Sequence, residues 1–144
     1  MNLSEYESPT IPKVKTDFYV KPNGDIVPST GYRYMDSRYY NMTSKSMEAP
    51  CSYVAFDKFK CGKYARQGLQ IKKAWNNDAR VLGKFDTLQI IDDLKVPCEY
   101  GNSGVDLEPL TWCYPEAGWG GYRQLYADSW IHFDEVILLE ECVE

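Results

Sequence analysis

The stretch Ile-Val-Pro-Ser-Thr-Gly-Tyr-Arg-Tyr-Met, residues 26–35, decides the fold of the first part of the chain. A Pro-Asn-Gly turn at 22–24 precedes it, so the apolar residues 18–20 and 26–27 on either side of the turn are expected to form a hairpin. After a Pro-Ser-Thr-Gly loop, residues 31–35 alternate in the manner of a further strand. The sequence therefore predicts a hairpin that leads through a short loop into a strand.

Arg33 is the residue of that strand with the most distinctive chemistry, because it stands between Tyr32 and Tyr34 directly after the loop. A guanidinium is planar, permanently charged, and carries a fork of N–H donors that matches phosphate oxygens. This favours a pyrophosphate, the central group of a dinucleotide, as its ligand. An edge-strand arginine paired with an acid would produce the same pattern, so the residues alone leave both interpretations open.

The remaining elements are expected to be short and mostly extended. Residues 36–49 read as a helix capped by Asp36 or Ser37, and a basic helical segment follows at 57–65. Strands are predicted at 52–56, 80–91, 122–126 and 133–139. Residues 1–16 are polar with two prolines and are expected to be a tail or linker, which leaves 17–144 as one domain. The total is an α+β fold, mostly β, with six to eight short strands and two small helices.

Composition restricts the class of protein. A chain of 144 residues suits a single domain, and 44% hydrophobic residues with 15% aromatic residues exclude intrinsic disorder. A formal net charge of −5 argues against a nucleic-acid partner, which requires a basic face. A cluster of lysines and arginines over 58–73 is expected to be a solvated surface. The chain has no apolar run long enough to span a membrane, and its acidic N-terminus lacks the pattern of a signal peptide.

Five cysteines and one histidine offer few ligands for a metal ion and few candidates for a catalytic nucleophile. No Cys-x-x-Cys pair is present, so zinc-ligand spacing is absent. Free thiols are expected, although one or two disulfides are compatible with the sequence. His132 lies in a strand-like run and is expected to be packed in the core. Asp92 and Asp93 are neighbours that point to opposite faces of a strand, which disfavours a shared ion. We therefore expect no metal site.

A second candidate constellation lies near the C-terminus, where Gly120 and Gly121 lead into a strand that carries Gln124. Two adjacent glycines allow a loop to approach a ligand closely, and Gln124 can hydrogen-bond a ribose hydroxyl or an attacking water. The run from Ser52 to Phe56 is a candidate pocket floor on which a flat ring stacks. The alternatives are a surface glutamine and a plain core strand.

The chain resembles the C-terminal effector domains of bacterial polymorphic toxins of the contact-dependent inhibition, Rhs and LXG types. The resemblance rests on residues 18–35, 85–97 and 107–124, and together these stretches span most of 17–140. It implies an enzymatic domain delivered as part of a larger secreted protein, acting in the cytoplasm of a target cell. It also implies a cognate immunity protein as partner.

The layout is also similar to that of the ADP-ribosyltransferase-like superfamily, including its NAD-glycohydrolase toxins. The resemblance implies a split sheet around a cleft, with NAD as substrate and no metal. Arg33 would grip the pyrophosphate, Gln124 would orient ribose or water, and the rings would contact the cofactor-binding residues Tyr32, Tyr34, Ser52, Phe56, Gly120 and Gly121. The transferase pattern requires glutamate at position 126, where this chain has Tyr126, and residues 52–56 match the Ser-Thr-Ser pattern imperfectly. NAD hydrolysis is therefore favoured over transfer to a protein acceptor.

Two other functions remain open on the sequence. A metal-independent ribonuclease toxin would use Arg33, Lys84 and tyrosines to stabilise a pentavalent phosphate. A non-enzymatic immunity or adaptor protein would use its acidic, tyrosine-rich surface to bind a basic toxin.

Cleavage of NAD needs few groups, because the enzyme mainly holds the dinucleotide, excludes water and places one polar group near the ribose.

Overall fold

The computed structural model describes residues 18–22, 24, 26–74, 76–94, 115–120 and 122–141. These residues form an α+β fold with seven strands and two α-helices, which confirms the predicted fold class. The strands are β1 (Phe18–Val20), β2 (Ile26–Pro28), β3 (Thr30–Met35), β4 (Glu48–Ala55), β5 (Val81–Asp86), β6 (Gln124–His132) and β7 (Glu135–Leu138). The helices are α2 (Tyr40–Ser46) and α3 (Gly62–Leu69), with short 3-10 turns at Ser37–Tyr39, Thr87–Ile90 and Pro115–Ala117. The predicted tail at 1–16 lies outside the described residues.

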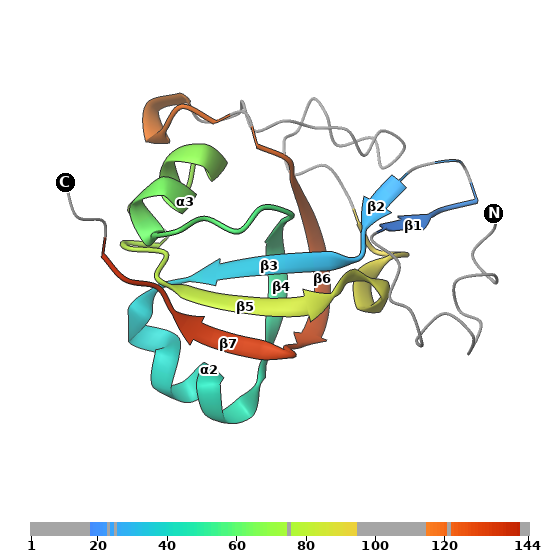
Figure 1. Cartoon of the computed structure of the whole chain (residues 1–144), viewed down its shortest axis with the longest axis horizontal. Helices are drawn as coiled ribbons and strands as arrows, with labels where there is room; N and C mark the ends of the chain where they lie inside the picture. Colours follow the sequence, from blue (N-terminus) through green and yellow to red (C-terminus); the bar gives the residue numbers. More distant parts are fainter. Residues whose placement is uncertain are drawn as a thin grey trace.

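The five longer strands form an antiparallel sheet in the order β6-β4-β3-β5-β7, and β1 and β2 form a separate hairpin. Strand β3 pairs with β5 along its whole length, from Thr30↔Asp86 to Met35↔Val81. Strand β3 meets β4 at one registered pair, Tyr32↔Ala55. Figure 1 shows β4 and β6 running across the direction of β3, β5 and β7. The sheet is therefore divided into two groups of strands that separate on one side of this pair.

The sheet buries apolar side chains on both of its faces. One core cluster contains side chains of β4, β5 and β6, with the fully buried residues Cys51, Val54, Phe85, Leu125 and Ile131 among them. A second cluster joins the opposite face of β3 and β5 to helix α3, with Tyr34, Leu69 and Leu82 among its members. Alternate residues of one strand serve the two clusters, because successive side chains of a strand point to opposite faces.

The first half of the chain follows the sequence prediction with shifted boundaries. Asp36 caps the first turn as expected, since its Oδ1 accepts a hydrogen bond from the Arg38 N–H at 3.0 Å. The helix ends at Ser46 because Met47 takes a left-handed φ of 57°, and β4 begins at Glu48. The predicted helix at 57–65 lies at Gly62–Leu69 instead.

The second half differs more from the prediction. The strand expected over 80–91 ends at Asp86, because the Asp86 carboxylate accepts from Leu88 N–H at 2.9 Å and starts a 3-10 turn. The break expected at the Ala-Asp-Ser run is absent, and β6 continues to His132. The carboxylate of Asp93 accepts hydrogen bonds from the Asp128 and Ser129 N–H groups at 2.6 and 2.9 Å. These two backbone donors of the edge strand β6 therefore have partners.

The thiols also differ in part from the prediction. Cys51 on β4 is free and fully buried, as expected of a thiol that behaves as a small apolar group. Cys61 is disulfide-bonded, which departs from the expected free thiols and corresponds to the disulfide alternative that the sequence left open. None of the helices in the described part of the chain combines the length and the apolarity that a membrane span requires.

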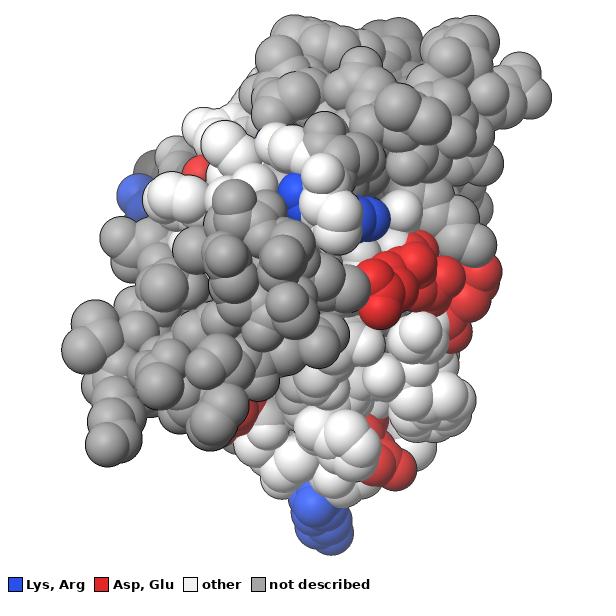
Figure 2. Space-filling model, turned by 90° about the vertical axis from the view of Figure 1, so that its right-hand side faces the viewer, with Lys and Arg blue, Asp and Glu red and all other residues white. Residues whose placement is uncertain are grey.

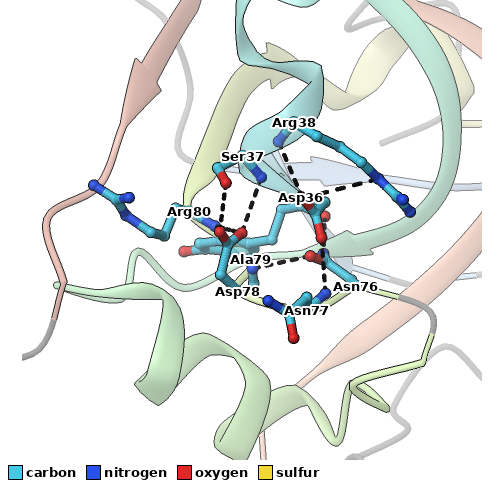
Figure 3. Close-up of polar contacts among 9 residues, drawn as sticks. Asp36, Ser37, Arg38, Asn76, Asn77, Asp78, Ala79 and Arg80 are labelled. Atoms are coloured by element: carbon cyan, nitrogen blue, oxygen red, sulfur yellow. Dashed lines mark hydrogen bonds and ion pairs between the residues drawn. The ribbon is translucent and has the colours of Figure 1, made fainter.

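A polar brace ties the end of β3 to the segment that enters β5 (Figure 3). Asp78 accepts hydrogen bonds from the N–H of Ser37 at 2.9 Å and from its hydroxyl. Asp36 accepts from Asn77 N–H at 2.9 Å, and the Asn76 side chain donates to the Tyr34 carbonyl at 3.1 Å. Partial burial raises the pKa of Asp78, but the hydrogen bonds from Ser37 and Arg80 and the charge of Arg80 together outweigh it and hold this pKa below its ordinary value.

We predict that Asp78→Ala lowers the free energy of unfolding by about 1–3 kcal/mol, because it leaves charge-assisted hydrogen bonds of Ser37 unmade. Urea denaturation at pH 7 measures this. The difference should shrink as the pH falls below about 4, where the carboxylate protonates and its contribution is lost. Glu140→Ala, at an exposed position, is the control and should stay within about 0.5 kcal/mol of the parent. Equal stability of the two variants would contradict the role of the brace.

Candidate functional site

A cavity of about 580 Å³ occupies the opening between β3 and β4. Its lining comes from five parts of the fold: β3 with the turn that follows, helix α2, strand β4, the residues after helix α3, and strand β6. The residues are Tyr32, Arg33, Tyr34, Met35, Asp36, Tyr39, Met42, Thr43, Ser46, Glu48, Ala49, Pro50, Ser52, Tyr53, Ala55, Leu69, Gln70, Ile71, Asn76, Gln124 and Trp130. Arg33 and Gln124, which lie 91 positions apart in the sequence (124 − 33), thus line the same cavity.

The paired strands β4 and β6 set the order of groups along the cavity. Gln124 lies opposite Ala55 at one end, and Trp130 lies opposite Pro50 at the other. A strand rises about 3.3 Å per residue, so the five steps from Ala55 to Pro50 cover about 16 Å. The cavity therefore has an amide near one end of its floor and an indole near the other.

Ser52 interrupts this floor. The register between β4 and β6 shifts between Pro50 and Ser52, and Ser52 has a left-handed φ of 51°. A bulge of this kind bends a strand and redirects its side chains. A serine in the left-handed region is uncommon, and such positions cluster at binding and catalytic sites. The predicted pocket residue Ser52 thus lies in the cavity lining at a strained position.

Arg33 extends from β3 toward this floor. Its Nη1 donates to the Tyr34 carbonyl at 2.9 Å, and its Nε donates to the Pro50 carbonyl at 3.4 Å. Both acceptors are neutral backbone groups, and Arg33 makes no ion pair with any described residue. Burial lowers the pKa of Arg33 from its ordinary value, although the guanidinium remains charged. The alternative of an edge-strand arginine paired with an acid is wrong in its first part, because β3 is the central strand of the sheet, and none of the described acids pairs with Arg33.

Gln124 begins β6 and is buried, with 7% of its surface exposed. Its Nε2 donates to the Leu69 carbonyl at 3.1 Å, at the last residue of α3. This bond holds the amide in one orientation and leaves its oxygen as an acceptor for a ligand. The alternative of a surface glutamine is therefore wrong.

The other predicted contacts fall into two groups. Tyr32 and Tyr34 line the cavity, and the hydroxyl of Tyr34 is committed to the protein: it donates to the Asp57 carbonyl at 2.8 Å and accepts from Phe59 N–H at 2.8 Å. Burial, the largest influence, raises the pKa of Tyr34, so this hydroxyl stays neutral.

Phe56 and Gly120 lie outside the cavity lining. Phe56 packs against the first core cluster, with the Arg123 guanidinium 5.2 Å from its ring centre. Gly120 N–H donates to the Gln67 carbonyl on α3 at 2.9 Å, and a side chain at Gly118 would collide with the Gln67 backbone. The glycines of this loop allow a close approach to helix α3 rather than to the cavity. Gly121 lies outside the described residues.

Several lining residues escaped the sequence analysis, chiefly Trp130 on β6, Met42 and Tyr39 near α2, and Gln70 after α3. Trp130 could have been predicted from the sequence if β6 had been expected to continue to His132. Period-two alternation along that strand then places Gln124 and Trp130 on one face. Gln70 has a left-handed φ of 51° at the C-terminus of α3, and its Nε2 donates to the Gly118 carbonyl at 3.1 Å. No sequence pattern indicates the position of α2 against the cavity.

Charge around the site is sparse. Arg33 is the one Lys or Arg in the described lining, and the lining carboxylates Asp36 and Glu48 are both engaged elsewhere. Asp36 caps the turn after β3, and Glu48 Oε2 lies 3.4 Å from His132 Nδ1. His132 has 74% of its side chain exposed, so the prediction that it is packed in the core is wrong. Among the described residues, no group of three or more His, Cys, Asp or Glu side chains is arranged to hold a metal ion.

Comparison with protein-family models, with curated proteins and with solved structures finds no match to this chain. The site is therefore interpreted from its own chemistry.

Cys51 beside Arg33 gives a prediction for alkaline pH. Burial raises the pKa of the Cys51 thiol to about 12, and the nearby Arg33 charge lowers it only in part. The unfolded chain ionises this thiol near pH 9 while the folded protein keeps its proton, so the free energy of unfolding should fall above about pH 9. The slope from this group is about 1.4 kcal/mol per pH unit up to the folded pKa.

Denaturant titrations at several pH values between 7 and 11 measure this slope, and Cys51→Ala supplies the comparison because it removes the ionisable group. The variant should lose less stability between pH 9 and 11 than the parent. Equal losses in the two proteins would contradict a neutral, buried thiol at position 51.

Proposed function

We propose that this protein is an interbacterial toxin domain that acts on NAD, chiefly as a glycohydrolase. The observation that carries the proposal is that Arg33 and Gln124 line one cavity, about 580 Å³ in volume, where the sheet opens. A cavity of this size is in the range of small-molecule and cofactor sites. The division of the sheet into two groups of strands also supports the proposed likeness to the ADP-ribosyltransferase-like superfamily.

The state of Arg33 supports an anionic ligand. A charge removed from water without a counterion is unfavourable, and the two backbone carbonyls offset this only in part. A pyrophosphate would supply the missing negative charge in a bidentate arrangement. The cost of holding the free guanidinium in the cavity would then be recovered when NAD binds.

Gln124 supports hydrolysis at the ribose. Cleavage of the bond between nicotinamide and ribose develops positive charge on the sugar, and the leaving group is neutral. The fixed oxygen of the Gln124 amide would accept a hydrogen bond from a ribose hydroxyl or from the attacking water. Tyr126 occupies the position where the transferase pattern has glutamate, so transfer to a protein acceptor is the less supported outcome.

The two rival functions gain less support. For a ribonuclease, Lys84 would have to join Arg33, but Lys84 is paired with Tyr32, on the face of β3 opposite to that of Arg33, and lies outside the cavity lining. On the face shown in Figure 2, acidic side chains gather in one patch while the lysine and arginine side chains stay scattered. A non-enzymatic adaptor would leave the unpaired charge of Arg33 without a purpose.

The biological setting follows from the proposed class of toxin. The domain would be the payload of a larger secreted protein, would act in the cytoplasm of the target cell, and would be neutralised by a cognate immunity protein. Residues at the cavity mouth would then have to remain accessible to NAD.

We predict that Arg33→Ala and Gln124→Ala each lower kcat/KM for NAD consumption by about two to three orders of magnitude, because each removes a group that contacts the ligand or the developing charge. Purified protein with NAD, followed by release of nicotinamide, measures this. Both variants should also abolish toxicity when expressed in bacteria without an immunity protein.

A matched control separates function from folding. Lys58→Ala removes an exposed positive charge outside the cavity lining and should keep full activity. Arg33→Met keeps the apolar stem but removes the unpaired charge, so it should be inactive yet no less stable than the parent in urea. Steady NAD with cleaved RNA would favour the ribonuclease, and a harmless, inactive wild-type protein would favour the adaptor.

A further inference from the structure

The cavity lining includes exposed apolar side chains, one of which, Trp130, lies at the end remote from Gln124. Among the described residues, nine large hydrophobic side chains are exposed, and three of these line the cavity: Tyr39 at 41%, Met42 at 64% and Trp130 at 63%. Exposed apolar side chains that are scattered singly are normal on a protein surface. Three on one cavity form a local concentration, which is the usual mark of a binding surface.

The backbone holds this end of the cavity in place. Trp130 is paired across the strands with Pro50, and the pair Glu48 with His132 lies two positions further toward the end of β6. The Gln89 side chain accepts from His132 N–H at 2.8 Å and donates to the His132 carbonyl at 2.9 Å. Phe133 N–H donates to the Met47 carbonyl at 2.7 Å, which ties the end of β6 to the residue after α2. Trp130 is therefore a large, flat side chain presented from a fixed strand.

The order of groups along β4 indicates what such a surface would bind. The Gln124 amide stands opposite Ala55, the Arg33 Nε contacts the Pro50 carbonyl, and Trp130 stands directly opposite Pro50. A ligand held at its anionic centre by Arg33 would place one end near Gln124 and the other over Trp130. An indole presents a large aromatic face, and flat nucleobases stack on such faces.

We propose that Trp130, together with Met42 and Tyr39, forms a subsite for the purine base of the dinucleotide. This inference rests on the proposed function, which assigns the nicotinamide ribose to the Gln124 end and so leaves the adenine for the Trp130 end. It makes Trp130 a residue that determines specificity and affinity, not one that acts on the bond that breaks.

The test compares two mononucleotides, AMP and nicotinamide mononucleotide, by isothermal titration calorimetry on the whole chain. Trp130→Ala should weaken AMP binding by about tenfold, the loss of one stacked base. It should leave the binding of nicotinamide mononucleotide unchanged, because that ligand lacks the purine. Trp130→Phe keeps a ring and should retain most of the AMP affinity. Trp119→Ala, which removes another exposed tryptophan outside the cavity, should change neither.

Kinetics and NMR provide the remaining arms. In NAD hydrolysis, Trp130→Ala should raise KM by about tenfold with little change in kcat, the pattern of a lost binding contact remote from the reacting bond. With unmodified protein, the H2 and H8 protons of bound AMP should show nuclear Overhauser contacts to the indole of Trp130, assigned by comparison with Trp130→Phe. This arm holds even where Trp130→Ala fails to fold.

The outcomes separate the subsite from the activity. One outcome overturns the subsite and leaves the proposed function standing. In it the protein consumes NAD, but Trp130→Ala binds AMP as tightly as the parent does, or bound AMP shows no contact to the indole. AMP binding that depends on Trp130, in a protein that consumes no NAD, supports the subsite and overturns the hydrolase. A protein that neither binds AMP nor consumes NAD overturns both.

Discussion

The site depends on one constraint, the single registered pair Tyr32↔Ala55 that joins β3 to β4. The two groups of strands run in different directions, so backbone pairing between them cannot be extended beyond this point (Figure 1). Strands β3 and β4 therefore form no further registered pairs, and the space between them is a cavity. Side chains from β3, β4 and β6 can then face one space, although they come from strands far apart in sequence. The polar brace around Asp78 keeps β3 aligned with β5 while it departs from β4.

Arg33 shows how the proposed function would conflict with stability in this fold. Tyr34 belongs to the second core cluster and so contributes to stability. Its neighbour Arg33 points to the opposite face of β3, where its charged guanidinium is partly removed from water. Its partners are two carbonyls, and a carboxylate at the same place would stabilise the free protein better. A carboxylate would also occupy the position that an anionic ligand needs. A guanidinium without a counterion is therefore consistent with selection for binding.

Local patterns predicted the elements that are governed by local rules. The β1–β2 hairpin, the Asp36 cap and the strand β3 depend on neighbouring residues, and each is present. The errors arise where a distant group decides the outcome. Strand β6 continues through Ala-Asp-Ser because Asp93 satisfies its N–H groups, and the loop before β6 turns toward α3 because Gly118 and Gly120 fit against Gln67. Arg33 and Gln124 were identifiable by their chemistry, but the contribution of Trp130 depends on where β6 ends.

Three local departures from favourable structure converge on this cavity, and their coincidence is the strongest argument that it has a function. Ser52 holds a left-handed backbone, Arg33 holds a charge that no described acid compensates, and Trp130 exposes most of an indole to water. Each is unfavourable alone, and a core that was selected only for stability would remove them. A ligand with an anionic centre and a flat ring at one end would compensate two of them at once, because it would neutralise the guanidinium and cover the indole. The register shift between Pro50 and Ser52, where β6 has one residue more than β4, lies between these two contacts and the Gln124 end.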